Sequence, residues 1–327
     1  MFAKRSKIIF GTQAVAETPL LLPSFSSKGF TEVRGIMNLM AEFITSPILI
    51  SAYDIHYRLI PKKITFSQLI FLDSGGYEAR IDHDLSETYG KLHKSRSWPK
   101  RLHERVLANW TSRWPTVAIT YDSPARFLSI AKQIESAHRA RKAYPNLLWE
   151  LLVKPESSRD ATTPIEKLLK RVSDLRGFAV IGLTEKELGD SVFDAMVRIA
   201  RLRTALNSVG LETPIHVFGS LDALTSVLYF LAGAEIFDGL TWLRFGYQDG
   251  KTVYSQNYGV FRDQEGLRRN TDERHFDMWR NNYYYLGKLR TQMINYERTR
   301  DLAHFGALEP LLRNALDQLE ATLAEAK

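Results

Sequence analysis

Eight short apolar segments lie between residues 20 and 241 of this 327-residue chain, and helical patterns separate most of them. Such runs are typical of buried parallel strands. The expected strands are Leu20–Ser24, Pro47–Ala52, Gln68–Asp73, Val117–Asp122, Leu147–Val153, Phe178–Leu183, Pro214–Gly219 and Ile236–Thr241. The helical patterns are Gly29–Phe43, Trp98–Trp114, Pro124–Ala143, Pro164–Leu175, Glu185–Leu206 and Leu221–Ala232. This alternation predicts an α/β fold, a (β/α)8 TIM barrel, with an open doubly wound sheet as the alternative.

The segments on either side of the eight strands have different patterns. Ile8–Pro23 alternates and turns, which predicts a β-hairpin leading into the first strand. Phe245–Tyr258 is rich in turn residues, Arg262–Arg300 mixes many Arg with Tyr and Trp, and Leu308–Ala326 has the Leu spacing of an amphipathic helix. We therefore expect a catalytic barrel over residues 1–245. Residues 246–327 are expected to form a basic, aromatic-rich helical extension packed on it.

Several polar residues fall at the ends of the expected strands. In barrels of this kind, catalytic groups lie at the carboxyl ends of the strands. Asp73 and Asp122 end two strands, and Asp238 lies inside the last one, where a carboxylate is costly without a use. Both acids could instead have a purely structural role: Asp238 could form an ion pair with Arg244, and Asp122 could be the N-cap of a helix. The joint placement at one mouth favours a site.

Two of these segments carry recognisable motifs. Asp73-Ser74-Gly75-Gly76-Tyr77-Glu78 and Gly233-Ala234-Glu235-Ile236-Phe237-Asp238, the latter followed by Arg244, resemble motifs of the tRNA-guanine transglycosylase superfamily. Ala16-Glu17-Thr18-Pro19 and His216-Val217-Phe218-Gly219 resemble two further motifs, in the same order. The resemblance implies exchange of guanine for a 7-deazaguanine. It also implies that Asp238 is the nucleophile at the sugar carbon and that Asp73 is the general acid and base.

The resemblance also implies a base-binding set. Its members are Ser74, Gly76, Tyr77, Asp122, Lys154, Gly182, Leu183, Phe218 and Gly219. Tyr77 is expected to stack on a base, although it could equally be an ordinary core residue. Two positions depart from the family pattern, because Glu78 and Lys154 each stand where the family usually has Gln. Lys154 therefore leaves the identity of the incoming base open.

The largest departure concerns metal. The family holds zinc through three Cys and a His, but this chain has no Cys, and Arg280 stands at the place of the His. We expect no metal and no cofactor. Because the zinc region helps the tRNA enzymes to bind RNA, its loss makes the chain most similar to the DNA 7-deazaguanine transglycosylase branch, which inserts preQ0 into DNA. The alternatives are a tRNA enzyme, an inactive nucleic-acid-binding barrel and a glycoside hydrolase.

The net charge of +7 favours a polyanionic partner. The partner expected here is double-stranded DNA, with an accessory protein of a DNA-modification system as a further candidate. The residues expected to bind the nucleic acid are Arg244, Lys91, Lys94, Arg96, Lys100, Arg101, Arg105, Arg268, Arg269 and Arg280. No apolar run is long enough to cross a bilayer, so we expect no membrane partner and a cytoplasmic location.

Overall fold

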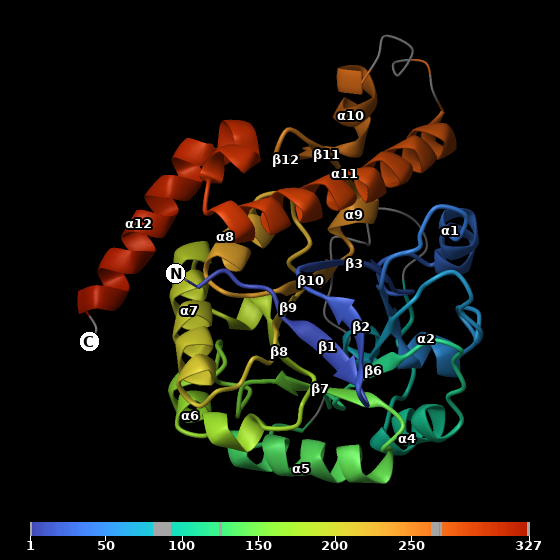
Figure 1. Ribbon diagram of the computed structural model, residues 1–327. Coiled ribbons are helices and arrows are strands. Elements are labelled where there is room, and N and C mark those ends of the chain that lie inside the picture. Colours follow the sequence, from blue (N-terminus) through green and yellow to red (C-terminus); the bar gives the residue numbers. More distant parts are fainter. Residues whose placement is uncertain (1, 81–92, 124–125, 263–267, 269, 326–327) are drawn as a thin grey trace.

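A computed structural model describes residues 2–80, 93–123, 126–262, 268 and 270–325 (Figure 1). Its centre is a closed barrel of eight parallel strands, in which β10 pairs with both β9 and β3. The strands are β3 Leu20–Phe25, β4 Ile48–Ser51, β5 Ile70–Asp73, β6 Thr116–Ile119, β7 Leu148–Val153, β8 Val180–Thr184, β9 Ile215–Phe218 and β10 Ile236–Gly239. The predicted (β/α)8 barrel is confirmed, and the open sheet is excluded.

Helices surround this barrel. They are α1 Val33–Met40, α2 Ala52–His56, α3 Gly76–Ala79, α4 Lys100–Ala108, α5 Ile130–Ala143, α6 Ile165–Leu169, α7 Val192–Ser208, α8 Thr225–Leu231 and α9 Thr241–Arg244. Several begin later than the sequence pattern suggested. The side chain of Ser129 caps α5 by accepting from the amide of Lys132, and the side chain of Ser191 caps α7 in the same way. These serines end the preceding loops and start the helices.

The predicted N-terminal hairpin closes one end of the barrel. Its strands, β1 Lys7–Phe10 and β2 Gln13–Glu17, pair antiparallel. Ile8 is 1% exposed and belongs to the same apolar cluster as Leu22, Phe71 and Ile236 inside the barrel. The hairpin therefore plugs the end at which the barrel strands begin, and a cavity opens at their carboxyl ends.

The C-terminal segment contributes to the barrel itself. It contains the hairpin β11 Phe245–Gln248 and β12 Lys251–Tyr254, then α10 Ser255–Arg262, α11 Thr271–Thr299, a 3-10 segment Leu302–Leu308 and α12 Glu309–Glu325. Helix α11 runs across the barrel in Figure 1, packs on β3 and α9, and shares one continuous core with the barrel. It thus takes the place of the eighth barrel helix. Helix α12 packs outside it, against α7.

Asn282 shows how closely the two parts are joined. Its side-chain amide donates to the carbonyls of Trp242 and Phe245, both at 2.6 Å, and accepts from the amide of Tyr247 at 2.8 Å. Asn282 is fully buried on α11, while its partners lie on α9 and β11. The chain on either side of residue 245, where the catalytic domain was expected to end, is therefore held together by buried hydrogen bonds.

Candidate active site

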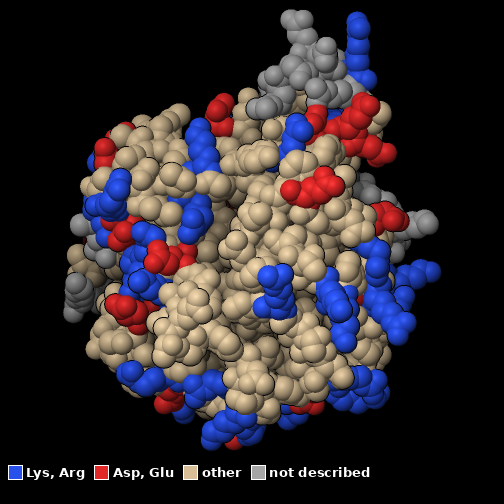
Figure 2. All heavy atoms as spheres, turned by 45° about the vertical axis from the view of Figure 1, so that its right-hand side comes forward, with Lys and Arg blue, Asp and Glu red and all other residues tan. Residues whose placement is uncertain are grey.

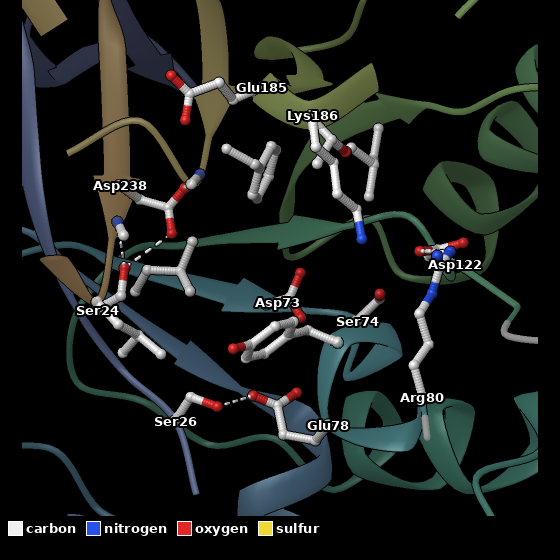
Figure 3. A pocket seen from close by; sticks show the side chains of 18 of the residues that line it. Ser24, Ser26, Asp73, Ser74, Glu78, Arg80, Asp122, Glu185, Lys186 and Asp238 are labelled. Atoms are coloured by element: carbon white, nitrogen blue, oxygen red, sulfur yellow. Dashed lines mark hydrogen bonds and ion pairs between the residues drawn. The ribbon is translucent and has the colours of Figure 1, made fainter. Parts of the chain in front are cut away.

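A cavity of about 420 Å³ opens at the carboxyl ends of the strands (Figure 3). This volume is in the range of small-molecule sites. The lining combines apolar side chains with many charged ones, which are Asp73, Glu78, Arg80, Asp122, Lys154, Glu185, Lys186, Asp238 and Arg244. Both predicted catalytic residues, Asp73 and Asp238, line it, and Figure 3 shows them on opposite walls.

Asp238 is the more enclosed of the two. Its side chain is held by three donors: the hydroxyl of Ser24 at 2.8 Å, the amide of Gly219 at 3.1 Å and the Nε2 of His216 at 3.2 Å. The residue is 6% exposed and faces the cavity. A carboxylate with this many donors has a fixed orientation, which a nucleophile requires.

Behind Asp238 lies a buried chain of charges. The Nδ1 of His216 lies 2.8 Å from Oε1 of Glu150, and both side chains are fully buried. Burial would lower the pKa of His216, but the carboxylates of Glu150 and Asp238 outweigh it and raise this pKa to about 9. At neutral pH, His216 is therefore an imidazolium that donates to both carboxylates. Phe218 stacks on its ring, with 3.9 Å between the ring centroids.

Asp73 has a different environment. It ends β5 and accepts one hydrogen bond, from the amide of Gly75 at 2.9 Å, whose φ of 86° lets the chain turn back toward the carboxylate. Removal from water raises its pKa to about 8, and the nearby carboxylate of Glu78 adds to this effect. Asp73 is therefore largely protonated at neutral pH.

Two serines and a buried acid complete the wall below Asp73. Glu78 is 2% exposed and accepts from the hydroxyls of Ser26 at 2.5 Å and Ser51 at 2.7 Å. The hydroxyl of Ser74 is buried, lines the cavity and has no partner among the described residues. A buried hydroxyl without a partner is uncommon, so Ser74 offers a hydrogen bond to a ligand in the cavity.

The third carboxylate, Asp122, belongs to a network at the far wall. It lies three residues beyond the end of β6, 3.1 Å from a guanidinium nitrogen of Arg80 and 3.7 Å from the ammonium of Lys154. Lys154 also donates to the hydroxyl of Thr184 at 3.1 Å and pairs with Glu187 at 2.5 Å. Among the described residues, Asp122 makes no helix N-cap, because Ser129 caps α5 instead.

The structure divides the expected base-binding residues into two groups. Ser74, Tyr77, Asp122, Lys154, Phe218 and Gly219 line the cavity, whereas Gly76, Gly182 and Leu183 do not. A Cβ on Gly76 would lie 2.9 Å from Oδ2 of Asp122, and one on Gly182 would lie 2.5 Å from Oε1 of Glu150. These glycines leave room for acids to pack, and Leu183 is a fully buried core residue.

Sequence reasoning also missed residues of this site. Glu185 and Lys186 line the cavity just after β8, and burial raises the pKa of Glu185 to about 7. Glu150 and His216 were missed too, although an acid inside LLWELLV and a His inside PIHVFG are visible signals. A charged side chain at a strand position that faces the barrel interior needs a partner there.

The expected nucleic-acid-binding residues are scattered. Arg244 lines the cavity, 3.4 Å from the hydroxyl of Tyr77. Lys94, Arg96, Lys100, Arg101 and Arg268 are exposed, Arg280 pairs with Asp277 on its own helix, and Lys91 and Arg269 lie outside the described residues. Two Arg of the basic Arg262–Arg300 segment do not line the cavity. Arg290 and Arg300 bind the carbonyls of Glu17, Pro19 and Ala3, by the hairpin end.

No protein-family model and no characterised protein matches this chain. Within the part of the chain that the structure describes, no three His, Asp or Glu side chains are grouped so that they could hold a metal ion. Among the same residues, no helix has both the length and the apolar composition that a bilayer crossing requires. The cavity and its carboxylates are therefore the features of this molecule that bear on function.

Proposed function

We propose that this protein is a base-exchange transglycosylase that replaces guanine in DNA with a 7-deazaguanine such as preQ0. The observation that carries the proposal is the pair of carboxylates in one cavity with different environments. Asp238 is held by three donors, and Asp73 keeps its proton at neutral pH. A pair of carboxyl groups whose environments separate their roles is the arrangement that double displacement at a sugar carbon requires.

In the first step, a carboxylate oxygen of Asp238 attacks C1′ of the nucleotide. The bond between C1′ and the guanine nitrogen breaks as Asp73 gives its proton to the departing base. An ester between Asp238 and C1′ remains. In the second step, Asp73 takes a proton from the incoming base, whose ring nitrogen attacks C1′ and displaces Asp238. Asp73 is then protonated again and Asp238 is again a free carboxylate. Both side chains have returned to their starting states, and one base has replaced another.

His216 supports both steps from behind. An imidazolium hydrogen-bonded to Asp238 stabilises its negative charge whenever the ester is broken, which makes Asp238 a better leaving group in the second step. Glu150 keeps the proton on His216. The cavity also offers the aromatic side chains of Tyr77 and Phe218 for contact with a base, and the polar groups of Ser74 and Lys154 for its edge.

DNA is proposed as the substrate because the features associated with tRNA binding in the family are missing. The chain has no Cys for a zinc site. Arg280, which stands at the position of the zinc-binding His, pairs with Asp277 on its own helix. Its guanidinium carbon lies 5.7 Å from the ring centroid of Phe276.

The proposal is tested by incubating the purified protein with labelled guanine and either duplex DNA or tRNA, and by running denaturing gels for a covalent adduct. We expect label in DNA, with an adduct that Asp238→Ala abolishes. Label in tRNA alone would reassign the substrate. Exchange in neither nucleic acid, together with no adduct, would contradict the proposal.

A further inference from the structure

A second cavity, of about 530 Å³, lies on the outer wall of the barrel between α1, α2 and α4. Its charged lining consists of Arg34, Arg58, Lys62 and Arg105, together with the imidazole of His56. The four cationic residues are exposed. Figure 2 shows this side of the molecule, where Lys and Arg side chains gather in the lower right part and Asp and Glu side chains are sparse.

The charge of this cavity is not balanced. Its lining contains no Asp or Glu, and none of the four cationic side chains has a carboxylate within 4.0 Å among the described residues. Like charges held around one cavity repel one another, and an anion bound between them removes that repulsion. The arrangement therefore favours an anionic ligand.

The backbone at Arg58 supports a ligand-binding role for its side chain. Arg58 follows the end of α2 with φ of 57°, in the left-handed region, and its carbonyl accepts a hydrogen bond from Arg34 at 2.6 Å. Helices commonly end in glycine at this position, because a side chain is strained in that conformation. At this position the backbone of Arg58 holds the guanidinium of Arg34, and the side chains of both residues line the cavity.

The cavity is also close to the candidate active site. Trp98 lies between the two, because its Nε1 donates to the carbonyl of Ser74 at 2.8 Å while its ring centroid is 5.5 Å from that of His56. Arg96 lies over the ring of Tyr57, 4.9 Å from its centroid, and extends the positive charge along the same side. One layer of aromatic side chains thus separates the anion-binding cavity from the wall of the active site.

We propose that this cavity binds a backbone phosphate of the nucleic acid, close to the nucleotide whose base enters the active site. The inference rests on the proposed function. Guanidinium groups match phosphate geometry through paired N–H donors, and Arg34, Arg58 and Arg105 supply three of them. A nucleic acid offers a phosphate every few ångströms along each strand, so a strand whose base enters the active site has further phosphates that can reach this cavity.

The test is the double variant Arg58→Gly with Lys62→Ala, which removes two charges. Glycine suits the left-handed backbone at residue 58, so the fold is not expected to suffer. The matched control is Lys142→Ala with Lys170→Ala, which removes two exposed charges on α5 and after α6. Binding of a short fluorescent DNA duplex, and separately of tRNA, is measured by anisotropy over a range of salt concentrations.

We expect the double variant to bind duplex about tenfold more weakly than wild type in 0.1 M salt, with the slope of log K against log salt reduced by about 0.9 for the one lost contact. The control should match wild type. If the cavity variant also matches wild type, the inference is wrong, even where base exchange occurs. If binding weakens in a protein that exchanges no base, the phosphate site stands and the proposed function fails. If wild type binds neither nucleic acid, both fail.

Discussion

Glu235 and Asp238 are two buried acids three positions apart: Glu235 immediately precedes β10, and Asp238 lies near the carboxyl end of that strand. Glu235 is fully buried and pairs with the guanidinium of Arg203 at 2.7 Å. It also accepts from the hydroxyls of Thr18 and Ser6. Asp238 has an imidazolium, a hydroxyl and an amide as its donors, and it faces a cavity rather than a packed plug.

This difference separates an acid that stabilises the fold, Glu235, from an acid that a ligand can reach, Asp238. At the hairpin end, the negative charge of Glu235 is matched by a permanent cation inside packed side chains, so neither Glu235 nor Arg203 is accessible to a ligand. At the other end, the charge balance of Asp238 depends on a titratable histidine, and the carboxylate stays within reach of a ligand. The placement agrees with the division in these barrels between a stabilising face and a catalytic face.

The largest expected effect is that of Asp238→Asn. This substitution should lower base exchange by at least about 10⁴-fold, because it removes the nucleophile while keeping the shape of the side chain. Thermal unfolding should stay close to that of wild type. Exchange rates and melting curves check both expectations. A variant that still forms the covalent adduct would assign the nucleophile to another residue.

Glu235→Gln should have the opposite pattern. It leaves the guanidinium of Arg203 buried without its counter-charge, which costs about 3–5 kcal/mol of unfolding free energy. Exchange per folded molecule should change little. Urea unfolding gives the first quantity and active-site titration the second. The double variant Arg203→Met with Glu235→Leu serves as the control, since removing both charges should cost less than the single change. A single variant that stays stable but loses activity would contradict the comparison.

The role of Asp73 predicts a pH dependence. The pKa of its carboxyl is raised to about 8, so the acid form needed for guanine release is present below that pH and lost above it. Adduct formation should therefore fall as pH rises through about 8, and Asp73→Asn should lower it by roughly 10²–10⁴-fold and remove this decline.

The same shift affects stability. Because the folded pKa lies above the ordinary value of 3.8, the stability that Asp73 contributes is present below that value and is lost as pH rises through about 8. Asp73→Asn should then be more stable than wild type above pH 8. If adduct formation by Asp73→Asn has the same pH profile as adduct formation by wild type, another group supplies the proton.

The smallest effect concerns Glu150→Gln. Without the Glu150 carboxylate, the raised pKa of His216 should fall from about 9 toward its ordinary value. In wild type, the stability that His216 contributes is fully present below pH 6.5 and is lost as pH rises through about 9. In the variant, this contribution should be lost at a lower pH. We expect about a tenfold loss of exchange, comparable to one lost charge-assisted hydrogen bond. NMR of ¹⁵N-labelled histidine measures the pKa directly, and an unchanged pKa would exclude the role of Glu150.

The sequence predicts the barrel well, because buried parallel strands appear as apolar runs and their spacing leaves few other folds. It also places Asp73 and Asp238 in one cavity, since strand order alone brings strand ends together. It could not show that Gly76 and Gly182 make room for Asp122 and Glu150, because that depends on packing between distant segments. Nor could it separate Arg290, which binds backbone carbonyls, from Arg244, which lines the cavity.

Helix α11 has a consequence for how the protein is made. All eight strands precede it in the sequence, yet it covers β3, the first of them, and buries Leu289 and Met293 in the common core. During synthesis, the apolar surface of β3 therefore stays uncovered until residues 271–299 have left the ribosome. Completion of the barrel fold is a late event, and a chain that stops at residue 245 should expose this apolar surface and aggregate.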